Sequence, residues 1–496
     1  MNEHSLWAVL PLQLPIWTTE MLRRSQEASL SVSIDPSIIK SDIVSKVLGQ
    51  AHRMMDLTLR SGCSDALLEK LFADCGSLHV PKLRKLCLRK DYLPATPLLL
   101  PTRLFHGTVK LRHLELSRMD ISWESDLLKD LTTLALEGTS RKPSWLQFQS
   151  MLQRMPRLQS LTIRHTLPSE PPEKKYTSPI HLPYLTMLCV DDEAVNCRPF
   201  FDMVSLSDRL ETSKYWLCTG DQATAAHICH LLSSADRIAT GKWLSASAQS
   251  LCINGVWNDL NPLNLSFNMA NGLFDPSTLG DMRISSAYDL PGLKFRVTEG
   301  RTSRRLGDVY NDITIGMFQA CHFQNLLELD LSTLWVSKLM PRFRDTLAAT
   351  YATLPMLHTV IVGHNTASYL IDILSFRSDE QGNDGMADGS DAPPSGVSDE
   401  ARGSGNVLEP SPQRSSSHIS FPALRNLKMC EVTFSGRECD LELDHLKKCL
   451  ITRSRCGVAI LFLVLEDCEK IFSKDVVELR NLVPRVYWNE EGDNEL

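Results

Sequence analysis

A short pattern of hydrophobic and polar positions recurs along the chain: an apolar residue, two variable residues, an apolar residue, one variable residue and a third apolar residue. Its clear copies are LRKLCL (83–88), LRHLEL (111–116), LTTLAL (131–136), LQSLTI (158–163), LTMLCV (185–190), LLELDL (326–331) and LRNLKM (424–429). Weaker copies are MMDLTL (54–59), AQSLCI (248–253), LHTVIV (357–362) and ILFLVL (460–465). The alternation is typical of a β-strand with one buried face, and a preceding proline, as in VPKLRKL, favours a turn. Each copy therefore predicts one short strand.

The copies are regularly spaced in the first part of the chain. Successive anchor leucines from Leu57 to Leu188 lie 29, 28, 20, 27 and 27 residues apart, within the range of about 20–29 residues that leucine-rich repeats show. Segments 63–75 and 144–155 carry apolar residues three and four apart, which predicts helices that lead to the next strand. The pattern thus predicts an α/β, leucine-rich-repeat-like solenoid, an irregular horseshoe, with a short N-terminal helical cap.

An ordinary α/β sheet whose buried strands are rich in leucine is the alternative fold. Past Val190 the spacing becomes irregular, with anchors 63 and 78 residues apart. We expect degenerate repeats between 191 and 325, where the pattern leaves the register open, and LPGLKFRVTEG (290–300) is one candidate.

Composition limits the class of partner. The chain has 496 residues, of which 43% are hydrophobic and 22% charged, and its formal charge is −7. These values are typical of globular proteins, and the acidic balance argues against nucleic acid as a partner. No apolar run approaches the length of about 18 residues that a membrane span requires, and Glu3, Pro11 and Pro15 argue against a secretory signal. The 14 cysteines contain no Cys-x-x-Cys pair, so we expect a reducing, cytoplasmic or nuclear location and no membrane partner.

The sequence carries none of the common catalytic or nucleotide-binding motifs, such as Gly-x-Ser-x-Gly, His-Glu-x-x-His or a phosphate-binding loop. HICH (227–230) places two histidines three residues apart but offers no second pair of metal ligands, and VDDEA (190–194) is typical of a solvated strand end. We therefore predict no enzyme activity, no catalytic residue, no cofactor and no bound metal.

The variable positions of the expected strands offer an interaction surface. In register they form three columns on the concave face. The first column is Asp56, Lys85, His113, Thr133, Ser160, Met187, Ser250, Glu328, Thr359 and Asn426. The second is Thr58, Cys87, Glu115, Ala135, Thr162, Cys189, Cys252, Asp330, Ile361 and Lys428. The third is Arg60, Arg89, Ser117, Glu137, Arg164, Asp191, Asn254, Ser332, Gly363 and Cys430.

Charged side chains on these columns are the candidate contacts to a partner. They are Arg60, Lys85, Arg89, His113, Glu115, Arg164, Asp191, Glu328 and Asp330. Because both signs of charge are mixed along the columns, they favour a protein or peptide partner over nucleic acid.

The two ends of the chain resemble a known family. SLW (5–7), followed by WTTEMLRRSQEASLSVSID (17–35), is similar to the segment directly after the F-box in fungal F-box proteins with leucine-rich-repeat-like C-terminal regions. LVPRVYWNEE (482–491) extends the resemblance to the end of the chain. In that family the F-box docks on the linker subunit of a cullin-based ubiquitin ligase, and the C-terminal region recruits the protein to be ubiquitinated.

This resemblance implies a substrate-recruiting module with a missing or truncated F-box, because only four residues precede Ser5. The linker subunit is an expected partner only if an F-box lies upstream, and a stand-alone scaffold or decoy is the alternative. The expected organisation is an F-box remnant and N-terminal cap (1–50), repeats (51–375), a disordered low-complexity loop (376–420), and C-terminal repeats with a cap (421–496). Trp7 and its apolar neighbours are expected to cover the first repeat near Leu57 and Leu59.

Overall fold

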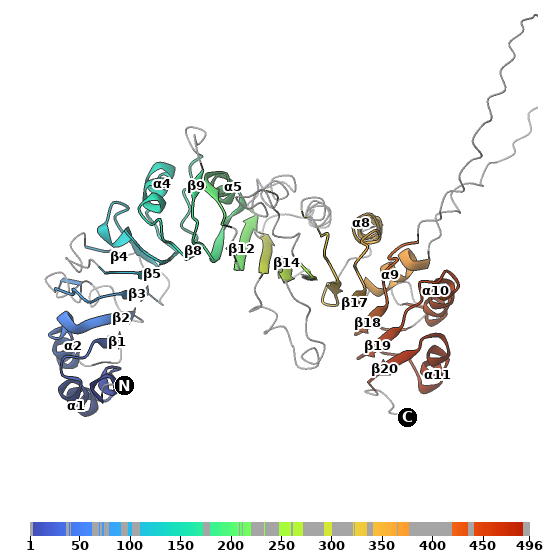
Figure 1. Ribbon diagram of the computed structural model, residues 1–496, viewed down its shortest axis with the longest axis horizontal. Coiled ribbons are helices and arrows are strands. Elements are labelled where there is room, and N and C mark those ends of the chain that lie inside the picture. The colour runs from blue at the N-terminus through green and yellow to red at the C-terminus, as the bar shows by residue number, and fades with distance from the viewer. Residues whose placement is uncertain are drawn as a thin grey trace, which may run out of the picture.

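A computed structural model gives the fold, and Figure 1 shows an arch with strands along its inner side and helices along its outer side. The residues that it describes are 3–35, 39, 41–61, 69, 72–73, 79–90, 98–101, 110–171, 179–207, 209–210, 212–219, 233, 248–258, 261–270, 292–299, 321, 323–334, 341–364, 366–375, 419–434 and 441–489. Nearly all of the expected disordered loop, residues 376–418, therefore lies outside the described residues, as does HICH at 227–230.

One sheet of sixteen strands runs through the described part of the chain. In spatial order its strands are β1 (Leu30–Ile34), β2 (Met54–Ser61), β3 (Lys85–Lys90), β5 (His113–Ser117), β7 (Thr133–Glu137), β8 (Ser160–Arg164), β10 (Met187–Glu193), β12 (Thr212–Thr219), β15 (Gly292–Glu299), β14 (Asn261–Ala270), β13 (Ser250–Asn258), β16 (Glu328–Leu331), β17 (Thr359–Gly363), β18 (Asn426–Cys430), β19 (Phe462–Glu466) and β20 (Arg485–Trp488). Neighbours pair in parallel except on both sides of β14, where the pairing is antiparallel. Two small sheets pair β4 (Leu98–Leu99) with β6 (Met119–Asp120) and β9 (Ile180–His181) with β11 (Val204–Ser205).

Helices cover the outer side of the sheet (Figure 1). They are α1 (Pro15–Ser25), α2 (Ser41–Leu48), α4 (Trp145–Gln153), α5 (Ala194–Met203), α8 (Pro341–Tyr351), α9 (Thr366–Ser375), α10 (Leu443–Arg455) and α11 (Ser473–Leu482), with short 3₁₀ turns at Glu3–Trp7, Ala51–Arg53 and Asp126–Leu128. Ser144 caps the start of helix α4: its hydroxyl accepts from the Gln147 amide, and the Gln147 side chain accepts from the Ser144 amide, as in a capping box. In the described residues no helix combines the length and hydrophobicity needed to cross a bilayer.

The prediction of a leucine-rich-repeat-like solenoid is wrong. The structure is an α/β fold with large parallel sheet regions, and the antiparallel strand β14 interrupts them. Across this interruption the spatial order β12-β15-β14-β13-β16 runs against the order of the chain. The pattern specifies buried parallel strands, but it does not specify which strands pair. The segment at 290–300, expected to be a degenerate repeat, contains β15, which pairs antiparallel with β14. The alternative of an α/β sheet with leucine-rich strands is therefore the better description.

The core lies between the sheet and the outer helices. The anchor leucines Leu57, Leu86, Leu114, Leu134, Leu161 and Leu188 are fully buried. Since side chains alternate between the two faces of a strand, the residues directly before and after each of these leucines in its strand face the inner side of the arch. Helix residues such as Phe148, Met151 and Phe200 complete the core from the outer side.

A residue in the left-handed conformation follows several strands directly. Arg118, His165, His364, Glu431 and Asp467 have φ between 43° and 56°, and Gly138 has φ 64° at the equivalent place after β7. A residue with positive φ turns the chain sharply, and only glycine adopts it without steric cost. The repeated turn carries the chain away from the inner face after each of these strands.

The N-terminal segment covers β1 and α1 instead of the expected edge near Leu57 and Leu59. The Arg24 guanidinium lies 4.7 Å above the Trp7 ring, and Val9 forms a parallel bridge with Ser31. The edge of β2 is already occupied, because β1 pairs with it in parallel along Leu57–Leu59. The expected short helical cap therefore contains a strand, β1, as well as helices.

Candidate interaction surface on the inner face of the sheet

The strand register brings the candidate side chains into columns on the inner face, which the described helices leave uncovered (Figure 1). Strand pairing aligns Lys85 with His113, Cys87 with Glu115, and Arg89 with Ser117, and the same register continues from β2 to β10. Glu328, Thr359 and Asn426 are aligned in the same way from β16 to β18. The register predicted for these strands is therefore confirmed, while the role of the columns in binding stays a prediction.

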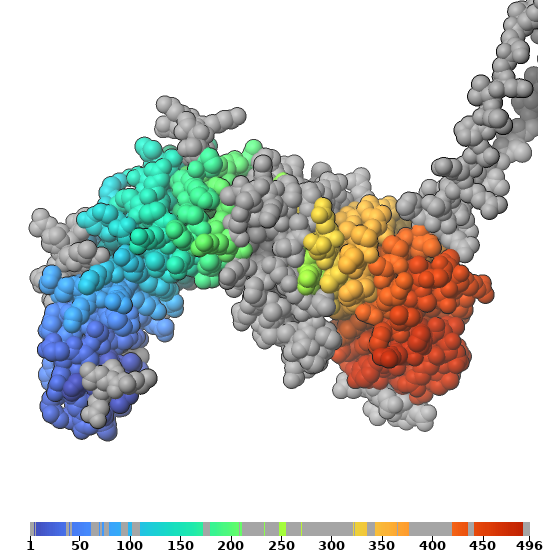
Figure 2. Space-filling model, viewed as in Figure 1, coloured from blue at the N-terminus to red at the C-terminus, as the bar shows by residue number. Residues whose placement is uncertain are grey.

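Two limbs of the arch carry most of the described inner surface. The N-terminal limb is β1 to β10, and the C-terminal limb is β16 to β20, drawn in blue to green and in yellow to red in Figure 1. In the space-filling view of Figure 2 the ends of the two limbs stand apart across the open side of the arch.

An ion pair joins β3 and β5 in the N-terminal limb. Arg89 Nε donates to Glu115 Oε1 at 2.6 Å, and His113 Nε2 lies 4.0 Å from Glu115 Oε2. The neighbouring His113 ring and the Arg89 guanidinium lower the pKa of Glu115 to about 2. This carboxylate is thus charged at neutral pH, and Arg89 already neutralises part of its charge.

The thiol of Cys87 lies beside His113 and Glu115. The ligand atoms of Cys87, His113 and Glu115 all lie within 4.8 Å of one another. Burial, and the Glu115 carboxylate beside it, raise the pKa of Cys87 to about 11. This thiol therefore keeps its proton at neutral pH in the absence of a ligand. Sequence reasoning placed Cys87 beside Glu115 in one column but missed the group, because a column does not give the distance between side chains on neighbouring strands.

Asp191 and Arg164 lie further along the same limb. His165 Nε2 is 3.8 Å from Asp191 Oδ1, and Arg164 is the pairing partner of Asp191 in the strand register. Burial raises the pKa of Asp191 above its ordinary value, although the nearby His165 and Arg164 act in the opposite direction.

Arg60, exposed on β2, aligns with Arg89 on β3. The two arginines place positive charge next to each other at the carboxyl ends of these strands.

The C-terminal limb carries a separate acidic group. Glu328 is only 6% exposed, and burial, together with the adjacent Asp330 carboxylate, raises its pKa to about 7. Asp330 accepts from the Cys252 thiol at 3.6 Å. Lys428 Nζ lies 2.5 Å from Glu466 Oε2. Of the two predicted contact residues here, Asp330 is partly exposed, whereas Glu328 is buried and cannot touch a partner in this structure.

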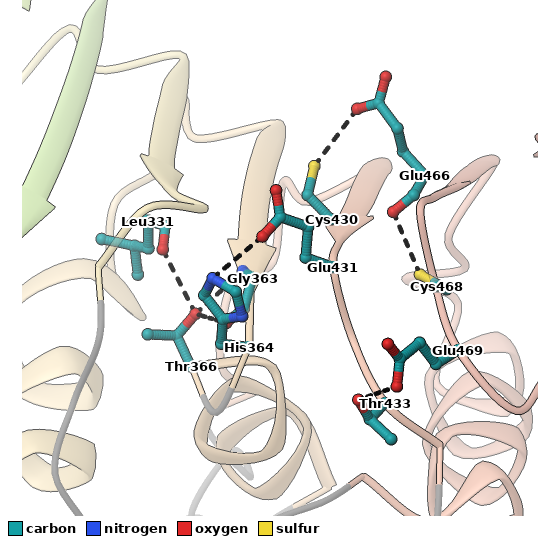
Figure 3. A network of polar contacts seen from close by, with 10 residues as sticks. All are labelled: Leu331, Gly363, His364, Thr366, Cys430, Glu431, Thr433, Glu466, Cys468 and Glu469. Carbon is teal, nitrogen blue, oxygen red and sulfur yellow. Dashed lines mark hydrogen bonds and ion pairs between the residues drawn. The ribbon is translucent and has the colours of Figure 1, made fainter. Parts of the chain in front are cut away.

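Polar contacts secure the turns at the carboxyl ends of β17, β18 and β19 (Figure 3). His364 Nε2 lies 3.3 Å from Glu431 Oε2, which joins the two left-handed residues that follow β17 and β18. The Thr366 hydroxyl donates to the Gly363 carbonyl at 2.6 Å. These contacts tie neighbouring strands together at the margin of the inner face.

Sequence reasoning also missed an aromatic group at the end of the C-terminal limb. Phe462 pairs with Arg485 in the strand register, and the Arg485 guanidinium lies 4.9 Å from the centre of the Phe462 ring. Phe462 is 40% exposed and Tyr487 is 63% exposed. The alternation in FLVLE and RVYW could have revealed these residues, because it continues the columns through β19 and β20.

The structure thus separates the predicted contact residues into groups. Lys85, Arg89, His113 and Glu115 lie together on β3 and β5, with Arg60 beside them on β2. Arg164 and Asp191 lie together on β8 and β10, while Glu328 and Asp330 lie on β16 in the other limb.

Comparison with known proteins adds no assignment. No protein-family model matches the chain, and no curated protein is significantly similar to it.

Proposed function

We propose that the inner face of the arch binds a protein partner. The observation that carries this proposal is the set of aligned side chains, many of them partly exposed, that the described helices leave uncovered along both limbs. Their charges are mixed, and basic and acidic residues lie in adjacent strands. Protein interfaces commonly combine such a polar surround with a few aromatic and arginine contacts.

Phe462, Arg485 and Tyr487 supply contacts of that kind. Tyrosine, tryptophan and arginine dominate the energetics of many interfaces, and aromatic rings bury a large apolar area there. The Phe462 and Tyr487 rings are both partly exposed on adjacent strands, and Arg485 packs over one of them. We expect this aromatic group to supply the largest share of the binding energy.

The resemblance to fungal F-box proteins supports a more specific role as the substrate-recruiting part of a ubiquitin ligase subunit. In that role the inner face holds the protein to be ubiquitinated. A stand-alone scaffold or decoy uses the same inner face without a ligase, and it is the second candidate. A chain extended upstream through any encoded F-box should co-purify a ligase linker subunit with the captured partner in the first role, and should capture the partner alone in the second.

The test compares proteins captured by the 496-residue chain and by its variants. Tyr487→Ala with Arg485→Glu alters the inner face, whereas Phe472→Ala removes an aromatic ring of similar exposure that precedes α11 outside the columns. We expect the double variant to lose a specific set of proteins that the wild type and Phe472→Ala both retain, with all three melting at similar temperatures. Equal capture by all three chains would overturn the proposal.

A further inference from the structure

We infer that Cys87, His113 and Glu115 form a binding site for a transition-metal ion of the zinc class. The site lies on the inner face, and the inference does not depend on the proposed function. Cys87 on β3 aligns directly with Glu115 on β5, and His113 precedes Glu115 by two residues, so it points to the same face. The sheet register therefore brings a thiol, an imidazole and a carboxylate to one place.

The spacing of the three ligand atoms is close to that required. They lie within 4.8 Å of one another. Metal–ligand distances of about 2.0–2.3 Å in a tetrahedron place ligand atoms about 3.3–3.7 Å apart. The group must therefore contract by roughly 1 Å, which side-chain rotation can supply. His113 and Glu115 are partly exposed, with side-chain exposures of 30% and 22%, and the inner side leaves them room to rotate.

An unsatisfied nitrogen points to a ligand at this place. His113 Nε2 is buried and has no hydrogen-bond partner among the described residues. A buried polar atom without a partner destabilises the fold, and most such atoms in native proteins are paired. A metal ion between His113 Nε2, Glu115 Oε2 and the Cys87 sulfur would satisfy it.

Glu115 is already oriented for this task. Arg89 holds the Oε1 oxygen through a hydrogen bond of 2.6 Å, while the other oxygen, Oε2, faces His113 Nε2 at 4.0 Å. Carboxylates that bind metals are commonly fixed in this way by a hydrogen bond to their second oxygen.

The set of donors selects the metal. Thiolate sulfur and imidazole nitrogen favour zinc, cobalt and similar ions over calcium and magnesium, which prefer oxygen. Three protein ligands leave a fourth position for water on the inner face, as in open zinc sites. Lys85 and Arg89 flank the group and oppose a divalent ion by charge repulsion. We therefore expect weaker binding than at a closed site with four protein ligands.

Cys189 provides a matched control on the same face. It is buried in the same column on β10, where it aligns with Lys214 on the next strand, β12, and Thr212 precedes Lys214 by two residues. The neighbours equivalent to Glu115 and His113 are therefore not metal ligands.

Cobalt titration of the metal-free, 496-residue chain tests the inference. Wild type and Cys189→Ser should both show thiolate-to-cobalt charge-transfer absorption with the d–d bands of a tetrahedral ion, and zinc should displace the cobalt. Cys87→Ser should lose one equivalent of the thiolate band. His113→Gln and Glu115→Gln should weaken binding at least 10–100-fold, the effect of losing even an outer-shell partner.

Two controls separate loss of metal binding from loss of folding. Thermal melting of each metal-free chain shows whether the variant folds, and the glutamine variants carry the test if Cys87→Ser does not. An unchanged cobalt spectrum in the folded Cys87, His113 and Glu115 variants would overturn the inference. So would a loss in Cys189→Ser equal to that in Cys87→Ser.

Discussion

Arg89 and Glu115 are joined across β3 and β5 by a hydrogen bond of 2.6 Å between Arg89 Nε and Glu115 Oε1. The two residues lie 26 positions apart in sequence, and only the parallel pairing of these strands brings them together. The pair lies at the centre of the group formed by Lys85, Cys87 and His113. It therefore fixes the local arrangement of the inner face in the N-terminal limb.

Replacement of Arg89 by methionine should reduce stability by about 1 kcal/mol, because Glu115 then keeps a partly buried charge without its closest cation. Arg23→Met on α1 is the control, since Arg23 is 71% exposed and its pair with Glu20 is solvated. Solvent screens exposed pairs of this kind, so the control should change stability less. Urea unfolding of the two variants measures the difference, and an equal loss in both would contradict this account of Arg89.

Leu161→Asp should unfold the N-terminal limb. Leu161 is fully buried, and an aspartate there places an unpaired charge in the core at a cost above about 4 kcal/mol. Thr162→Asp changes the next residue of β8, which faces the inner side and is partly exposed. We expect that control to cost about 1 kcal/mol, and circular dichroism during heating distinguishes the two outcomes. Similar melting temperatures would mean that the two faces of β8 have been assigned wrongly.

Asp192→Asn should destabilise the junction between β10 and α5 by about 1–3 kcal/mol. Asp192 is 1% exposed and accepts from the Leu167 amide, the Glu193 amide and the Asn196 side chain. An asparagine has only one acceptor oxygen, so at least one buried donor loses its partner. Asp202→Asn on α5 is the control, because Asp202 is 47% exposed. Denaturant unfolding should leave this control within about 0.5 kcal/mol of wild type, and a loss as large as that of Asp192→Asn would refute the prediction.

Glu328 should make stability depend on pH in an unusual direction. Its folded-state pKa of about 7 lies above the ordinary value of 4.5, so the folded chain binds more protons than the unfolded chain between these values. Stability should therefore fall as the pH rises from about 4.5 to 7 and stay lower above that range. Glu328→Gln should remove this dependence. The wild type should lose about 1–3 kcal/mol of unfolding free energy between pH 5 and pH 8 that the variant keeps.

Asp345→Asn is the control for Glu328, because Asp345 is 70% exposed on α8. Unfolding free energies of the wild type and both variants across this pH range give the comparison. A wild type and a Glu328→Gln variant with the same pH dependence would show that the Glu328 carboxyl is not held in its protonated form.

The sequence predicted local strands and their register well, because buried leucines at alternating positions leave only one face for the core. Lys85, His113 and Thr133 were aligned correctly from this pattern alone. Strand pairing over long distances was not predictable in the same way. The antiparallel strand β14 (Asn261–Ala270) carries no copy of the pattern, so nothing in the local sequence marks the place where the spatial order reverses.

The candidate site was predictable only in part, for a related reason. A column identifies which residues share a face, but it does not give the distance between side chains on neighbouring strands. The closeness of Cys87 to His113 and Glu115 depends on that distance, as does the burial of Glu328. The aromatic group at Phe462 and Tyr487 was overlooked because the columns were ended at β18, two strands too early.

Photo-crosslinking from defined positions tests the central claim, that the inner face binds a protein, most directly. A photoreactive amino acid at Lys85 or Tyr487 lies on the inner face, whereas the same probe at Leu146 on α4 or Val477 on α11 lies on exposed helix positions. In an extract of its native cells, the chain should form a crosslink to one and the same protein from Lys85 and Tyr487, and none to that protein from Leu146 or Val477. Crosslinks to a partner from the helix positions alone would contradict the account.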